Sequence, residues 1–325
     1  MVPFRNRPEA EHRAAMLVVA HVFLVVGACA GSGYLRHGKP NEWAGLVGVT
    51  LGAAAWMWVH CARAVPALPP LRQVATGALL FFAFGQPFFL WRMVHHQSGV
   101  LVWAMRALSV AAAMLVLGYV VAAERRRWAG ALFGTLILMA FLLRVLLLLD
   151  SPDPGTDPQR FLASWASDIY SFTNGGADRL LRGENPYTGS YPPWTADGRG
   201  MWNYYTYPPG FLLLSLPGRW LLGDVRWMHL LAIFFAAGCL YRMGRGVAEG
   251  ERRLLVLLLL LHPRSLYLHE QAFTEPMVAA VALAMATAAV EKRWVATGAL
   301  VGLAFMPTGT VLPLVGEVPL WLQIG

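Results

Sequence analysis

The chain has 325 residues, of which 57% are hydrophobic and 14% are charged, and its formal net charge is +8 at pH 7. This composition is too apolar for an ordinary soluble domain and predicts an all-α, polytopic membrane protein. The lysines and arginines are dispersed between apolar runs and form no basic face with interleaved aromatic residues, which argues against nucleic acid as a partner.

Apolar runs of the length needed to cross a hydrocarbon core of about 30 Å recur along the chain. We expect nine transmembrane helices, at residues 14–31, 43–60, 74–91, 99–122, 129–149, 226–242, 253–268, 272–290 and 295–315. The run at 253–268 is the weakest, because Pro263 and Arg264 interrupt it. The first run follows three arginines and also fits a cleavable signal peptide, which is the alternative for that segment.

The apolar runs divide the chain into three regions. We expect a five-helix membrane region at 1–149, a polar segment with juxtamembrane helices at 150–225, and a second membrane region at 226–325. The cysteines are odd in number and far apart, so they predict neither a disulfide framework nor a metal site.

The distribution of basic residues predicts the topology. If the N-terminus is cytoplasmic, the inside connections contain the arginine groups at 125–127 and 242–253 and the pair Lys292 and Arg293, whereas the outside connections of the first half carry few basic residues. Cytoplasmic loops are enriched in Lys and Arg, so this orientation is favoured over its mirror image. Residues 150–207 then face away from the cytoplasm.

The segment 150–207 combines seven carboxylates, four arginines and many aromatic residues. A connection of this length is either disordered or functional, and its aromatic content argues against disorder. Residues 157–172 predict a helix at the membrane interface, with its aromatic and aliphatic side chains on one face. Asp168 falls on that same face, so we expect it to point toward the protein interior or a cavity; the alternative is a loop carboxylate or salt-bridge partner.

The chain after this helix predicts a turn, a short helix and a return to the bilayer. Gly175 and Gly176 are expected to end the periodicity, and RLLRGENPY at 179–187 is expected to form a second short amphipathic helix. Residues 205–218 are too short to span, so we expect a juxtamembrane or re-entrant segment there.

Several motifs in this half of the chain occur in a recognisable order. They are D-I-Y at 168–170, R-L-L-x-G-E-N-P-Y at 179–187, Y-P-P-G at 207–210, GDVRW at 223–227 and HEQAFTEPMVAAVALA at 269–284. In this order they resemble the large first loop and following helices of GT-C glycosyltransferases. Within that superfamily the chain is most similar to bacterial polyprenyl-phosphate-sugar-dependent mannosyltransferase-like membrane proteins, over roughly residues 150 to 310.

The resemblance implies an inverting transfer of a sugar from a polyprenyl-phosphate donor to a lipid or glycan acceptor of the bacterial cell envelope. The enzyme would lie in the cytoplasmic membrane, among membrane lipids, with its active site on the extracytoplasmic side. Asp168 matches the loop carboxylate that acts as general base on the acceptor hydroxyl. The family implies no certain cofactor and leaves a divalent cation open.

The leaving phosphate needs positive charge, and the sugar needs polar contacts. Arg264 is the candidate phosphate contact, with a side chain snorkelling to lipid headgroups as the alternative. The expected substrate-binding residues beside it are His269, Gln271, Glu275, Asn185, Tyr187 and Tyr207. Glu275 also fits ordinary stabilisation of a helix N-terminus, and Asn185 fits a turn.

Two features depart from the family pattern. Relatives often carry a lysine or similar polar residue after a GLAF-like stretch, whereas this chain reads GLAFMPTGT. The chain also ends at VPLWLQIG, so an incomplete or noncatalytic protein is one alternative. A transporter or a lipid-handling assembly subunit is the other. Mid-helix charges are few, mainly Arg106 and Arg144, and the acidic groups concentrate in one outside segment, which favours the enzyme over a transporter.

The topology can be tested with two introduced cysteines. Ser190→Cys is expected to react with a membrane-impermeant thiol reagent added outside, because alternating basic loops place it outside the cytoplasm. Gly246→Cys is expected to react only after the membrane is permeabilised. Labelling of Gly246→Cys alone in intact cells would reverse the scheme.

Overall fold

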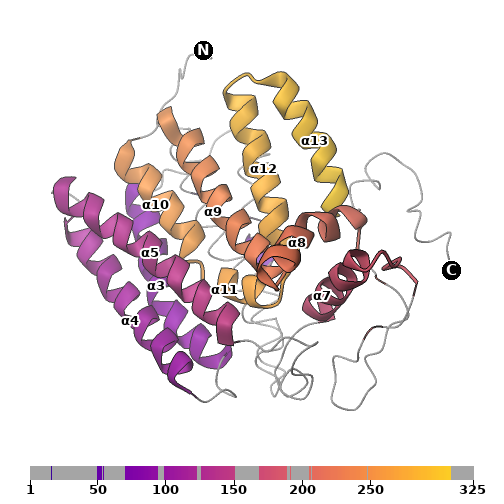
Figure 1. Cartoon of the computed structure of the whole chain (residues 1–325). Coiled ribbons are helices and arrows are strands. Elements are labelled where there is room, and N and C mark those ends of the chain that lie inside the picture. The colour runs from indigo at the N-terminus through magenta and orange to yellow at the C-terminus, as the bar shows by residue number, and fades with distance from the viewer. Residues whose placement is uncertain are drawn as a thin grey trace. The chain divides into compact units, whose positions relative to one another are not determined.

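The computed structural model describes residues 70–93, 99–122, 126–150, 168–188, 207–246 and 248–308, together with residues 16, 50–52, 54, 191 and 205. These residues form helices and no strand, which confirms the predicted all-α class (Figure 1). The main helices are α3 (Leu71–Met93), α4 (Val100–Val121), α5 (Arg126–Asp150), α7 (Asp168–Leu181), α8 (Pro209–Leu222), α9 (Arg226–Met243), α10 (Glu249–Leu260), α11 (Pro263–Glu270), α12 (Glu275–Val290) and α13 (Trp294–Thr308). A 3-10 turn at Gly244–Gly246 follows α9.

The helices belong to two compact units. The first contains α3, α10 and the parts of α4 and α5 between Arg106 and Met139. Within it α10 packs along α3, and the ring of Phe82 lies 5.0 Å from that of His262. Arg253 of α10 pairs with Glu249 and lies 5.5 Å over the ring of Phe133. The second unit contains α7, α8, α9, α12, α13 and most of α11, and it carries nearly all of the predicted site residues.

Fewer helices can cross a membrane than the sequence suggests. Among the described residues, Val100–Val121 and Trp128–Asp150 are long and apolar enough, and the bent pair α8 and α9 adds a third if it forms one span. The expected nine spans are therefore not supported. A spanning helix needs about 20 residues, whereas α10, α12 and α13 have 12, 16 and 15. The expected spans at 14–31 and 43–60 lie outside the described residues.

The predicted span at 253–268 is instead two helices. Helix α10 ends at Leu260, where the N–H of Leu261 bonds to the carbonyl of Leu257, and α11 begins at Pro263. Proline cannot donate to the preceding turn, and the residue before it is disfavoured in the helical conformation. The interruption foreseen at Pro263 is thus enough to end the helix.

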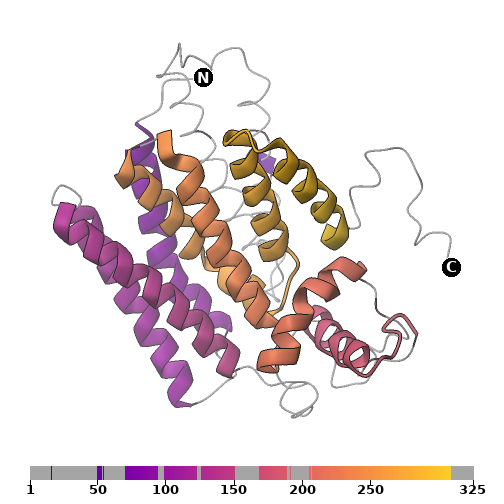
Figure 2. The same cartoon turned by 45° about the horizontal axis from the view of Figure 1, so that its top comes forward.

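Helices α8 and α9 meet at an angle of 115° (Figure 2). Gly223 ends α8 in the left-handed conformation with φ 79°, and its N–H bonds to the carbonyl of Arg219. This bond, from the residue after the helix to a carbonyl four residues back, is that of the αL capping motif, and the N–H of Asp224 bonds in addition to the carbonyl of Gly218. Helix α8 has only 14 residues, in agreement with the prediction that this segment is too short to span alone.

Helix α7 runs through the two glycines that were expected to break it. A Cβ on Gly175 would lie 3.0 Å from the ring of Tyr191, and one on Gly176 would lie 3.1 Å from the ring of Tyr205. The glycines therefore allow aromatic rings to approach the helix rather than ending it. Residues 179–181 belong to the last turn of α7, so the expected second amphipathic helix is wrong; Gly183, with φ 74°, closes the C-terminus instead.

Helices α9 and α12 run parallel. Their carboxyl ends lie together, because the hydroxyl of Thr287 donates to the carbonyl of Cys239 (3.1 Å) and Arg242 pairs with Glu291. Helix α13 follows α12 after a short turn and packs back along it, as Figures 1 and 2 both show.

The tight turn between α8 and α9 predicts opposite effects for two glycine substitutions. A Cβ on Gly218 would lie 2.8 Å from the carbonyl oxygen of Asp224 and 3.0 Å from Met228, so Gly218→Ala is expected to lower the free energy of unfolding. Overpacking of this kind costs about 1 to 3 kcal/mol. The matched control is Gly298→Ala in α13, where a Cβ meets nothing within 4 Å and alanine favours the helix by roughly 0.5 to 1 kcal/mol.

The two variants are compared by thermal unfolding in detergent. A lower midpoint for Gly218→Ala and an equal or higher midpoint for Gly298→Ala are expected. Equal midpoints for both would show that the α8–α9 turn has room for a side chain.

Candidate active site

The first two turns of α7 are enclosed on every side. Each side chain from Ile169 to Asn174 is buried, which differs from the one-sided amphipathic helix expected at 157–172. The helix begins at Asp168 and continues to Leu181, while residues 157–167 lie outside the described part of the chain. Asp168 is thus the first helical residue; its side chain, like that of Arg264 in α11, lies outside the described parts of the structure.

The other charged residues of this segment form ion pairs. Asp178 accepts hydrogen bonds from both Nε and Nη2 of Arg219, at 2.7 and 2.8 Å, which ties α7 to α8. Glu184 pairs with Arg182 at 2.7 Å and with Arg179 at 3.6 Å, which fixes the turn after α7.

Tyrosines from the following segment cover α7. The ring of Tyr191 packs edge-on to that of Phe172, with centroids 5.2 Å apart, and its hydroxyl donates to the carbonyl of Pro186 (2.6 Å). Tyr205 is buried as well, and burial raises the pKa of its phenol well above its usual value. Its hydroxyl therefore stays protonated and available as a donor.

Three predicted sugar contacts lie in or beside this tyrosine layer. The side-chain oxygen of Asn185 accepts a hydrogen bond from the N–H of Tyr187 (2.9 Å), so Asn185 makes the turn that was its alternative reading. The hydroxyl of Tyr187 donates to the carbonyl of Tyr207 at 2.9 Å. Tyr187 remains 38% exposed, so its ring still presents a face to solvent.

A buried ion pair lies at the start of α9. The guanidinium of Arg226 is fully buried and donates to the Asp224 carboxylate, with Nη2 2.6 Å from Oδ2. Tyr170 of α7 donates its hydroxyl to the same oxygen at 2.9 Å, and Arg226 lies 4.1 Å over the tyrosine ring. Burying two charges is costly unless they are paired and hydrogen-bonded, and both conditions are met here.

The same guanidinium reaches two further helix ends. Nη2 donates to the carbonyl of Leu148 near the end of α5 (3.2 Å), and Nη1 lies 3.5 Å from the carbonyl of Glu270 at the end of α11. The amide of Gln271 donates to the Glu270 carboxylate at 3.3 Å. Burial raises the pKa of Glu270 to about 7. One arginine thus joins four segments beside a carboxyl group that titrates near neutrality.

His269 and Gln271, both predicted substrate contacts, are almost completely buried. His269 Nε2 lies 3.3 Å from the carbonyl oxygen of Arg144, and burial holds the pKa of the imidazole well below its usual value, so the ring is neutral. Its Nδ1 is buried without a hydrogen-bond partner among the described residues. A neutral imidazole held in this way has one nitrogen left for a ligand.

The start of α7 lies next to the start of α12. Ile169, which follows Asp168, packs in one cluster with Phe211 and Met277, and Tyr207 lies against that cluster. Met277 is in the first turn of α12, where Glu275 is exposed. Segments about a hundred residues apart therefore bring Asp168, Tyr207 and Glu275 into one region.

The turn into α12 is strained. Ala272 is buried and has φ 53°, a left-handed conformation that costs an L-residue about 1 to 2 kcal/mol. Such strain persists only where the surroundings hold the backbone in place, and it is common near binding sites.

Four residues of this cluster were not predicted as site residues, although each lies in a motif described above: Tyr170 in D-I-Y, Asp224 and Arg226 in GDVRW, and Glu270 in HEQAF. A usable signal was present, because Arg226 stands at the outer end of an expected span, where the positive-inside rule disfavours arginine.

The described residues contain no group of three or more His, Cys, Asp or Glu side chains placed to hold a metal ion. Comparison with known proteins found no matching family model, no similar curated protein and no similar solved structure.

The raised pKa of Glu270 predicts a pH-dependent stability. The folded protein holds this proton up to about pH 7, whereas the unfolded chain releases it near 4.5. The contribution to the free energy of unfolding is therefore complete below 4.5 and is lost as the pH rises through about 7. A shift of this size corresponds to at most about 3 kcal/mol.

Glu270→Gln, which cannot ionise, is expected to unfold at a higher temperature than the parent at alkaline pH and at nearly the same temperature at acidic pH. The exposed Glu275→Gln is the matched control and should show no such divergence. If the difference in unfolding temperature between the parent and Glu270→Gln did not change with pH, Glu270 would ionise with its ordinary pKa.

Proposed function

We propose that the protein is a GT-C-type membrane glycosyltransferase that moves a sugar from a polyprenyl-phosphate donor to an extracytoplasmic acceptor with inversion. The observation that carries the proposal is the meeting of the α7 start, which carries Asp168, with the α12 start and the buried cluster around Arg226. This arrangement joins the same segments whose motifs resemble the GT-C family.

The roles follow from what the reaction requires. Asp168 would act as general base on the acceptor hydroxyl, because a carboxylate at a helix N-terminus is favoured in its ionised form by the helix dipole. Arg264 would contact the leaving phosphate, where negative charge accumulates as the glycosidic bond breaks. His269 Nδ1 and the exposed ring of Tyr187 would contact the sugar.

Burial makes this region suitable as a reaction site. Charges and dipoles act more strongly where water is excluded, and the Arg226 cluster fixes their positions in advance. The missing family lysine or similar polar residue after the GLAF stretch keeps the noncatalytic lipid-handling subunit as the rival, which would bind the donor without transferring sugar.

Asp168→Asn tests the proposal directly. The amide keeps the shape and loses the base, so turnover is expected to fall by roughly 10²- to 10⁴-fold with donor affinity nearly unchanged. The measurements are release of polyprenyl phosphate from a polyprenyl-phosphate sugar by the purified chain, and binding of the same donor. Glu184→Gln removes a carboxylate from the same segment at an exposed position and should leave turnover intact.

Arg264→Ala is the comparison variant and should weaken donor binding as well as turnover, since a phosphate contact serves both the bound donor and the departing charge. Full turnover by Asp168→Asn would refute the base assignment. Donor binding without any transfer by the parent would favour the noncatalytic subunit.

A further inference from the structure

A pocket of about 420 Å³ lies between α9, α12 and α13, at the end of these helices remote from Arg226. Its lining residues are Phe235, Gly238, Cys239, Arg242, Ala284, Thr287, Ala288, Glu291, Arg293, Ala296 and Leu300. On α9 and α12 they recur at helical spacing, so each helix contributes one continuous face. Along α9 the charged end of the pocket at Arg242 is roughly 24 Å from Arg226, and its near end at Phe235 is roughly 14 Å from Arg226.

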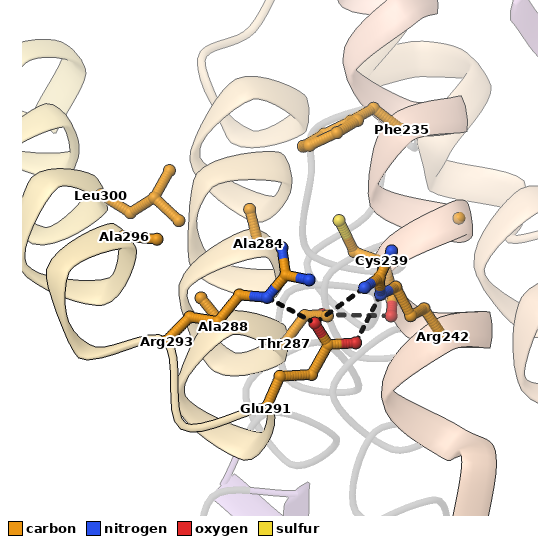
Figure 3. Close-up of a pocket in the computed structure, with 11 residues that line it drawn as sticks. Phe235, Cys239, Arg242, Ala284, Thr287, Ala288, Glu291, Arg293, Ala296 and Leu300 are labelled. Atoms are coloured by element: carbon orange, nitrogen blue, oxygen red, sulfur yellow. Dashed lines mark hydrogen bonds and ion pairs between the residues drawn. The ribbon is translucent and has the colours of Figure 1, made fainter.

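The pocket is amphipathic along its length. In Figure 3 the Glu291 carboxylate lies between Arg242 and Arg293 at one end, and Phe235 lies at the other. The walls between are largely alanine, glycine and leucine. A Cβ on Gly238 would meet nothing within 4 Å, so the space beside α9 is open. An apolar channel with a charged mouth suits an amphiphile.

The mouth is cationic. Arg242, Arg245 and Arg293 surround the single carboxylate of Glu291, with nearest approaches of 2.5, 3.9 and 3.2 Å. Arg242 makes the double contact with Glu291, while the side chains of Arg245 and Arg293 are 68% and 64% exposed. Three guanidinium groups against one carboxylate leave positive charge at the mouth, directed outward. The carbonyl ends of α9 and α12 attract these cations, but one glutamate and two helix dipoles do not neutralise three arginines.

Exposed apolar residues stand next to these arginines. Trp294 and Val295 begin α13 and are 68% and 90% exposed. Tryptophan is enriched at the level of lipid headgroups, and arginine beside it is the usual partner of anionic lipid. Arginines beside an exposed tryptophan, at the mouth of an apolar channel, are the combination that a lipid headgroup and its acyl chain require.

We propose that this pocket binds a bilayer glycerophospholipid with an anionic phosphate headgroup, its phosphate on Arg245 and Arg293 and one acyl chain along Gly238, Ala284 and Ala288. The site is separate from the sugar-transfer region and does not depend on the proposed function. An anionic lipid held there would brace α9 against α12 and α13.

The test is native mass spectrometry of the purified full chain in detergent with added dioleoyl phosphatidylglycerol, dioleoyl phosphatidylcholine or glycerol 3-phosphate. The parent is expected to retain phosphatidylglycerol in preference to phosphatidylcholine. Arg293→Gln and Arg245→Gln should each weaken phosphatidylglycerol binding about fivefold, the usual contribution of one arginine to anionic lipid. Gly238→Leu, which fills the channel, should weaken it as well.

Two matched controls separate the site from general charge and packing effects. Lys292→Gln removes a neighbouring exposed cation that, unlike Arg245 and Arg293, is not paired with Glu291 at the mouth, and Gly134→Leu adds the same side chain as Gly238→Leu to an exposed, open position of α5. Both should bind lipid like the parent. Circular dichroism and thermal unfolding confirm that each variant is folded.

Three results would overturn the proposal. Equal retention of phosphatidylglycerol and phosphatidylcholine would remove the role of the headgroup charge. Glycerol 3-phosphate binding as tightly as the lipid would mean a site for free phosphate. Unchanged lipid binding in both Arg293→Gln and Gly238→Leu would place the lipid elsewhere. None of these outcomes bears on sugar transfer, so the two proposals can fail independently.

Discussion

The second unit depends on the contacts of one buried group, the guanidinium of Arg226. It pairs with Asp224, covers the ring of Tyr170 and bonds to the carbonyl of Leu148, which joins α9 to α7 and to the end of α5. Removing one partner of a buried pair leaves an uncompensated charge and costs about 3 to 5 kcal/mol, whereas an apolar replacement of the whole pair is often tolerated. The pair therefore specifies which segments meet more than it adds net stability.

The contacts of Arg226 help to explain why the segment that begins with α7 is folded although it is rich in charged residues. Asp178 and Glu184 are each satisfied by arginines nearby, and the rings of Tyr191 and Tyr205 press on glycines where a side chain would not fit. The Glu184 pairs are local, whereas Asp178 pairs with Arg219 41 positions away and Arg226 bonds to Leu148 78 positions away. A segment fixed in this way can hold a functional group at its first residue, because the backbone at that point has little freedom left.

The sequence predicted the helices whose apolar runs are unbroken and misjudged those whose limits depend on distant contacts. Helices α4, α5 and α9 begin and end within a few residues of the predicted spans, because hydrophobicity alone sets their length. Helix α7 was predicted to stop at Gly175, since glycine weakens an isolated helix, but ring packing from residues far along the chain outweighs that weakness. His269 and Gln271 were predicted from the HEQAF motif and stay predictions as substrate contacts, whereas the partners of Arg226 on α5 and α7 are set by the fold.

The two carboxyl groups near Arg226 differ in a way that bears on the chemistry. The Asp224 carboxylate receives the guanidinium directly, at 2.6 Å, and is held as an anion by that contact. Arg226 reaches Glu270 only through its backbone carbonyl, so the Glu270 side chain is desolvated without an equal compensating charge and its pKa rises to about 7. Environments that shift the pKa values of two neighbouring carboxyl groups in opposite directions are typical of sites in which one group stays ionised and the other donates a proton. Glu270 is therefore the carboxyl group of the two whose charge changes near neutral pH, while Asp224 stays ionised and keeps Arg226 in position, and the pH-dependent stability expected of the parent arises from Glu270.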